Sequence, residues 1–151
     1  MEYRKMQTCG ANTSLLGFGC MRFPTINKDG KDVIDREAAE EMLDLAYKSG
    51  VNYFDTAYPY HNGESELFVG EALKKYPRDS FYLATKLPMW DVHSADDVRR
   101  LFEKQLEKLQ MDYVDFYLLH GLNDGSFKTV VEFDIVSILE ELRNEGKIRN
   151  I

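Results

Sequence analysis

Cysteine is scarce in this sequence, with Cys9 and Cys20 the only two among 151 residues. Two cysteines are too few for a disulfide framework, and these two lack the spacing of a metal site. The three histidines, His61, His93 and His120, are far apart in the sequence and have no cysteine nearby. These residues predict that the chain has no metal centre and keeps its thiols reduced in the cytoplasm.

Several other features are also missing. No apolar stretch is long enough to cross a membrane, and residues 1–5 lack the apolar segment of a secretory signal. The net charge is -7 with both signs interspersed, which makes nucleic acid and anionic membrane surfaces poor partners. The composition, 44% hydrophobic and 30% charged, is that of one globular domain with a sizeable core.

Strand and helix patterns alternate along the chain at intervals of roughly thirty residues. Residues 1–19 are expected to form a small hairpin that leads into a first strand, with residues 6–8 and 14–19 flanking its turn. Three later strands are expected to end at Asp55, Lys86 and His120, and another begins at Lys147. Four helices are expected between the strands. The first helix starts at the N-cap Asp35 and stops at Gly50, and the second runs from about residue 65 to 77. The third helix follows a capping box at Ser94 and Asp97. The fourth helix follows a loop at residues 121–126 and stops at Gly146.

The strands are near-continuous apolar runs, as in a parallel sheet that is covered on both faces. An eight-stranded barrel needs about 250 residues. This chain supplies four βα units, an N-terminal hairpin and the start of a fifth strand. We therefore predict an α/β fold that is a partial TIM (β/α)8 barrel. Residues 1–151 would then form a single, incomplete domain. A flavodoxin-like sheet of five strands is the alternative. It is disfavoured because no glycine-rich phosphate loop follows the first strand.

Four polar residues, Asp55, Tyr60, Lys86 and His120, lie at or just beyond the ends of three successive predicted strands. Any one of them alone is more often a solvated turn residue or a hydrogen-bonded structural group. Because they occupy equivalent positions in their units, parallel strands would bring them to the rim where barrel enzymes keep their chemistry. A carboxylate, a phenol, an ammonium and an imidazole at one rim predict a proton-transfer site.

Four stretches of this sequence closely resemble the aldo-keto reductases. They are residues 16–22 (LGFGCMR), 55–60 (DTAYPY), 84–86 (ATK) and 115–120 (DFYLLH). Residues 145–151 are also similar to that family's approach to its fifth barrel strand. The resemblance covers essentially the whole chain but only the N-terminal half of a typical member. Within the family, the sequence looks most like bacterial and archaeal members that often carry a C-terminal iron–sulfur segment.

The resemblance implies an oxidoreductase that reduces aldehydes or ketones with NADPH, or alternatively with NADH. Tyr60 would be the general acid that protonates the carbonyl oxygen, with Tyr58 as a competing candidate. Lys86 would favour the phenolate, and Asp55 would keep Lys86 charged and in place. His120 would bind the substrate oxygen and orient it.

The resemblance also implies binding residues. Gly19, Cys20, Met21, Arg22 and Asp55 would approach the cofactor, and Trp90, His61 and His120 would line the substrate pocket. Without the resemblance, Gly19 would be an ordinary glycine at the end of a strand and Met21 a core residue. Trp90 and His61 would be ordinary loop residues.

The truncation leaves a second function open. The family binds its dinucleotide mainly with the second half of the barrel, which is absent from these residues. A half barrel also exposes two sheet edges, which favours pairing with another chain. The alternative to an enzyme is therefore an incomplete fragment or interaction module that associates through the open barrel edge.

Overall fold

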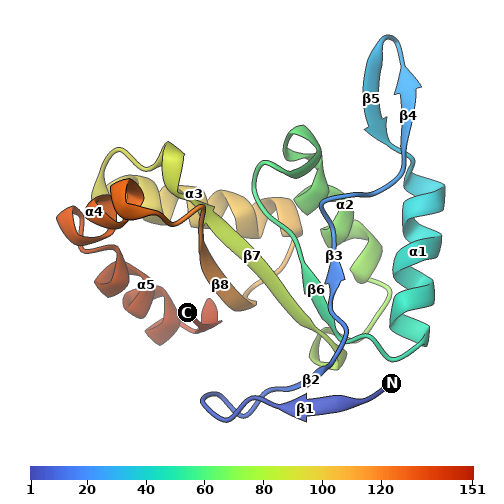
Figure 1. The fold of residues 1–151 in the computed structure, drawn as a ribbon, viewed down its shortest axis with the longest axis horizontal. Helices are drawn as coiled ribbons and strands as arrows, with labels where there is room; N and C mark the ends of the chain where they lie inside the picture. Colours follow the sequence, from blue (N-terminus) through green and yellow to red (C-terminus); the bar gives the residue numbers. More distant parts are fainter.

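A parallel sheet of five strands forms the frame of the molecule in the computed structural model, which describes all of residues 1–151 (Figure 1). The strands are β3 (Phe18–Gly19), β6 (Tyr53–Asp55), β7 (Tyr82–Pro88), β8 (Val114–His120) and β9 (Ile148–Asn150). They neighbour one another in the order of the sequence, all parallel. A doubly wound sheet would reverse its order at a switch point. The prediction of a partial (β/α)8 barrel is thus confirmed, and the flavodoxin-like alternative is excluded.

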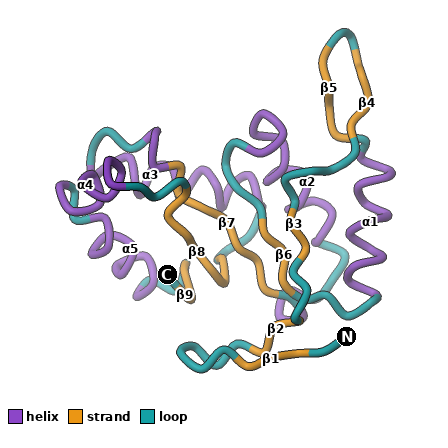
Figure 2. Tube along the Cα trace, in the orientation of Figure 1, coloured by secondary structure: helices purple, strands orange, loops and turns teal.

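Five helices lie along one side of this sheet (Figure 2). They are α1 (Arg36–Lys48), α2 (Glu64–Leu73), α3 (Ala95–Leu109), α4 (Asp124–Glu132) and α5 (Ile135–Asn144). Strand residues alternate between the two faces, so Phe54 and Leu83 are fully buried while their neighbours Tyr53 and Tyr82 are only half-buried. The helices therefore cover the outer face, and the inner face of the half barrel stays open.

The ends of α1 and α3 test the predicted caps. Asp35 caps α1 as expected, accepting a hydrogen bond from the Ala38 amide at 3.2 Å. The capping box before α3 forms differently. The Asp97 carboxylate accepts from the His93 amide and from the Ser94 hydroxyl, both at 3.0 Å. The Ser94 hydroxyl itself accepts no hydrogen bond from the amides of the first turn.

Two hairpins differ from the sequence-based expectation. In the first, β1 (Tyr3–Lys5) pairs with β2 (Asn12–Ser14), so residues 6–8 form part of the turn instead of an arm. The second hairpin, β4 (Thr25–Lys28) with β5 (Lys31–Ile34), is not predicted at all. Its signal is the pair Asp29-Gly30, which adopts positive φ angles of 54° and 78° at the turn, as Asp-Gly does in tight hairpins.

The segment after β8 also differs from the expectation of a loop and one helix. Helix α4 begins at Asp124, within the expected loop, and is separated from α5 by Asp134 with a φ of 47°. Asn123 starts α4 because its side chain accepts from the Gly125 and Ser126 amides at 2.9 and 3.1 Å. The Asn residue expected to mark a loop is therefore a helix cap.

The N-terminal hairpin lies across the end of the sheet where the strands begin (Figure 1). The Tyr3 hydroxyl donates to the Gly50 carbonyl at 2.9 Å, and the Asn12 amide donates to the Tyr82 hydroxyl at 3.0 Å. This end is thereby covered, and the opposite end, where the strands finish, is left open. None of the helices has the length and apolar character needed to cross a membrane.

Candidate active site

The register of the parallel strands places three polar side chains on one rim. Asp55 is the last residue of β6 and aligns with Ala84 of β7. Lys86 lies two residues further along β7, and so on the same face as Ala84. His120 ends β8 opposite Pro88. Tyr60 follows β6 at the start of a 3-10 turn, Tyr60–Gly63, which returns the phenol toward the strand ends.

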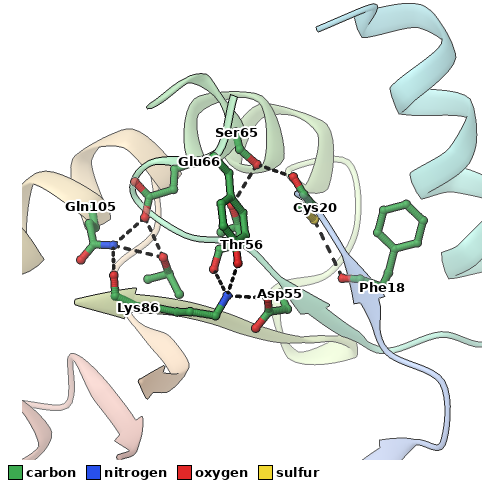
Figure 3. A network of polar contacts seen from close by, with 10 residues as sticks. Phe18, Cys20, Asp55, Thr56, Ser65, Glu66, Lys86 and Gln105 are labelled. Atoms are coloured by element: carbon green, nitrogen blue, oxygen red, sulfur yellow. Dashed lines mark hydrogen bonds and ion pairs between the residues drawn. The ribbon is translucent and has the colours of Figure 1, made fainter. Parts of the chain in front are cut away.

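Lys86 connects three parts of this rim (Figure 3). Its Nζ donates to Asp55 Oδ1 at 2.5 Å, to the Thr56 carbonyl at 2.8 Å and to the Tyr60 hydroxyl at 3.2 Å. An ammonium has three protons, so all of them have acceptors. The Lys86 side chain is 12% exposed and that of Asp55 29%. This partial burial makes the ion pair stronger than one on the open surface.

His120 lies on the other side of Tyr60. Its ring meets the Tyr60 ring edge-on, with centroids 5.7 Å apart, and lies 5.0 Å from the Trp90 ring. Burial, reinforced by the charge of Lys86 and opposed by Asp55, lowers the pKa of His120 below its usual 6.5. The imidazole is therefore neutral at neutral pH. It can act both as a donor and as an acceptor, and its buried Nδ1 has no partner within the chain.

A cavity of about 680 Å³ opens above these residues. Its walls include six residues singled out from the sequence, namely Met21, Arg22, Tyr60, His61, Trp90 and His120. The structure adds Phe23, Thr25, Pro59 and Asn62 to the lining. Sequence reasoning missed Phe23 and Thr25 because no residue pattern shows that the chain at the start of the β4–β5 hairpin packs beside the turn that carries Tyr60. Pro59 and Asn62 are neighbours of Tyr60 and His61 in that turn.

The remaining predicted residues lie beneath this cavity. Gly19 is exposed beside Asp55, and a Cβ there would meet no atom within 4 Å. Cys20 is fully buried. Its amide donates to the Asp55 carbonyl at 2.8 Å, and its carbonyl accepts from the Ser65 hydroxyl at 2.9 Å. Burial and the Asp55 charge raise the pKa of the Cys20 thiol. The Cys20 side chain does not line the cavity, and its backbone links the end of β6 to α2.

Tyr58, the competing proton donor, points elsewhere. The Lys108 ammonium of α3 lies 4.5 Å from the centroid of the Tyr58 ring, and Tyr58 is absent from the cavity lining. The geometry therefore favours Tyr60, whose hydroxyl contacts Lys86 and whose ring borders the cavity.

His61 connects Phe23 in the cavity wall to the turn that carries Tyr60. Its Nε2 accepts a hydrogen bond from the Phe23 amide at 3.1 Å, and the two rings lie 5.7 Å apart. Burial, followed by the nearby Arg22 charge, lowers the pKa of His61 below 6.5. Only the neutral imidazole can accept this bond, since both nitrogens of the protonated ring are donors.

A pH dependence of stability follows from His61. The pKa of His61 is near 6.5 in the unfolded chain and lower in the folded chain, so the unfolded chain binds a proton at His61 more readily. The free energy of unfolding therefore falls as the pH drops from about 6.5 toward the lower pKa of the folded chain. Replacing His61 by Gln, whose amide oxygen can still accept from Phe23, is expected to reduce this fall. The measurement is urea unfolding of both proteins between about pH 7 and pH 5. Equal slopes would contradict the assignment.

No group of three or more His, Cys, Asp or Glu side chains is arranged to hold a metal ion. The polar groups gathered at the rim are an acid, a base and hydrogen-bond donors. They can hold a carbonyl oxygen and transfer a proton to it.

The profile of the Aldo/keto reductase family matches residues 15–151. The chain is 33% identical to L-galactose dehydrogenase of Arabidopsis thaliana over 157 residues, covering 100% of this chain and 47% of that protein. It is 32% identical to the NADH-specific methylglyoxal reductase of Escherichia coli (strain K12), covering 94% of this chain and 46% of that protein.

The fold agrees with these sequence matches. An aldo-keto reductase from Klebsiella pneumoniae, solved in complex with NADPH, superimposes with a TM-score of 0.78 at 29% identity, over 99% of this chain and 48% of that one. The chain thus spans about half the length of the curated relatives it matches. It belongs to the aldo/keto reductase family.

Proposed function

We propose that these residues are the proton-donating half of a carbonyl reductase that converts aldehydes or ketones to alcohols with a nicotinamide cofactor. The observation that carries this proposal is the position of Lys86, which binds Asp55 and the Tyr60 hydroxyl at once beneath an open cavity. Family membership supports the same chemistry.

Each rim residue has a part in the proposed reaction. Tyr60 donates its hydroxyl proton to the carbonyl oxygen, and Lys86 stabilises the negative charge left on the phenol oxygen. Asp55 and the Thr56 carbonyl hold the ammonium in place. Neutral His120 donates one N–H to the substrate oxygen, orients it and stabilises the charge that develops there.

The residues present fit part of a nicotinamide group. Gly19 leaves open space beside Asp55, and Met21 and Arg22 line the cavity next to Tyr60. We therefore assign Gly19, Met21, Arg22 and Asp55 to cofactor contact, and Cys20 to supporting them from beneath. When bound, the cofactor supplies the hydride that reaches the carbonyl carbon. Trp90, His61 and His120 then border the substrate.

The test is turnover in a complete-barrel protein that contains these residues. We expect oxidation of NADPH coupled to loss of an aldehyde or ketone, with NADH less effective. Among the relatives, the Klebsiella pneumoniae reductase is solved with NADPH, whereas the Escherichia coli enzyme is NADH-specific, so both nucleotides belong in the assay. Failure to reduce any member of a panel of aldehydes and ketones with either nucleotide would overturn the proposal.

The isolated 151-residue chain is also proposed to self-associate. Its open inner face carries an aromatic cluster in which Phe116 lies 5.3 Å from Tyr53 and 6.1 Å from Tyr82, and Leu118 beside it is 39% exposed. Strands β3 and β9 end the sheet with unpaired backbone edges, which attract further strands. Light scattering at low concentration is expected to show a dimer that Leu118→Glu weakens. A monodisperse monomer would contradict this proposal.

A purely non-catalytic interaction module is not favoured. Such a module has no need of Asp55, Tyr60, Lys86 and His120 together, and all four are present in one constellation. The thiols of Cys9 and Cys20 are unpaired, which supports the proposal of a cytoplasmic protein.

A further inference from the structure

A second polar cluster lies behind Lys86, between β7 and the helices (Figure 3). Glu66 of α2, Thr85 of β7 and Gln105 of α3 are fully buried. Glu66 Oε1 accepts from the Thr85 hydroxyl and from Gln105 Nε2, both at 2.7 Å, and Glu66 Oε2 accepts from Lys108 Nζ at 2.8 Å. A buried carboxylate with this many donors is held firmly, because the loss of any donor leaves charge unpaired.

The amide of Gln105 has only one orientation in this cluster. Its Nε2 faces the Glu66 carboxylate, which can only accept, and its Oε1 accepts from the Tyr117 hydroxyl at 2.6 Å. Burial, together with the charge of Glu66, raises the pKa of Tyr117 well above 10. Tyr117 therefore stays a phenol and remains a donor, which keeps the Gln105 nitrogen directed away from it.

That nitrogen also reaches the backbone of Lys86, donating to its carbonyl at 3.0 Å. On this side of β7 the Ala84 carbonyl accepts from the Thr56 amide at 2.9 Å. Carbonyls two residues apart in a strand point the same way, so the Lys86 carbonyl points toward β6 as well. Because β6 ends at Asp55, no strand amide is available there, and Gln105 supplies the missing donor.

We propose that Gln105 is a positioning residue for Lys86. By holding the Lys86 carbonyl, it fixes the part of β7 beyond the end of β6, from which the ammonium reaches Asp55 and the Tyr60 hydroxyl. Glu66 and Tyr117 in turn fix Gln105. The link to catalysis rests on the proposed function, but the effect on the Lys86 ammonium does not, and it can be measured without turnover.

The test is the rate at which the Lys86 ammonium protons exchange with water, followed by NMR of the ¹⁵N-lysine-labelled 151-residue chain. Gln105→Leu is expected to accelerate this exchange about tenfold, since the Lys86 carbonyl loses its hydrogen bond from Gln105. Leu101→Ala is the control. It truncates a buried apolar residue of the same helix and should lower stability without changing the exchange. Unchanged exchange in Gln105→Leu, or equal acceleration in both variants, would overturn the proposal.

A second variant keeps the test decisive if Gln105→Leu does not fold. Tyr117→Phe removes only the hydroxyl that orients Gln105 and keeps the ring, which packs against Phe102 at 4.9 Å. It is expected to accelerate Lys86 exchange several-fold, and no acceleration would count against the proposal.

Turnover separates this proposal from the proposed function. In a complete barrel, Gln105→Leu should lower kcat and leave the KM for the nucleotide nearly unchanged. If the wild-type barrel reduces no carbonyl, the proposed function fails while the exchange result still decides the role of Gln105. If turnover occurs and Gln105→Leu changes neither exchange nor kcat, only the positioning role is wrong.

Discussion

Replacing Tyr60 by Phe in a complete-barrel protein is expected to lower kcat by about 100-fold to 10,000-fold, the usual contribution of a positioned general acid. The substitution removes one oxygen, the atom that accepts from Lys86 Nζ at 3.2 Å, and keeps the ring that packs against His120. Nucleotide affinity should stay nearly unchanged, because Phe fills the same space beside the cavity. Single-turnover reduction and a nucleotide titration measure the two effects separately.

Tyr58→Phe is the matched control for this prediction. It also removes one phenol oxygen, from a ring two residues away that lies over Lys108 and outside the cavity lining. It should leave kcat close to that of the wild type. If Tyr60→Phe retains wild-type kcat and Tyr58→Phe does not, the proton donor has been assigned to the wrong tyrosine.

Replacing Lys86 by Met is expected to lower kcat by about 100-fold or more, since the phenol oxygen loses the only ammonium that binds it. Met preserves the length and apolar stem of the side chain. The Asp55 carboxylate, which is 29% exposed, remains partly solvated, so the fold should tolerate the change. Thermal unfolding of the variant checks this, and the pH dependence of kcat reports the chemistry.

Lys108→Met provides the comparison for Lys86→Met. It removes an ammonium that pairs with buried Glu66 at 2.8 Å. It is therefore expected to lower the free energy of unfolding while changing kcat much less than Lys86→Met does. A Lys86→Met protein that keeps the wild-type pH dependence of kcat would show that Lys86 and Tyr60 are not coupled.

Much of the fold could be predicted because its signals are local. Asp35 caps α1 through its own side chain, and apolar runs of strand length need burial wherever they occur. Apolar residues that recur at helical spacing in α3, such as Val98 and Phe102, are fully buried, as that spacing predicts. The errors were also local. The Asp29-Gly30 turn is a short-range signal from which no hairpin was predicted, and Asn123 is a helix cap within the segment expected to be a loop.

The rim residues were recognisable for a related reason. A titratable group near the end of an apolar strand stands out in a sequence, and a repeat of roughly thirty residues places Asp55, Lys86 and His120 in corresponding parts of their units. Parallel pairing then brings such positions together without any further information.

The sequence by itself determined the alternation of parallel strands with helices, the rim on which Asp55, Lys86 and His120 lie, and the family. Only the tertiary structure decided which tyrosine meets Lys86, that His61 is bonded to Phe23, and that Gln105 holds the Lys86 carbonyl. These contacts join residues from 19 to 38 positions apart. No periodicity encodes them, because a buried polar side chain finds its partner through the packing of whole helices and strands.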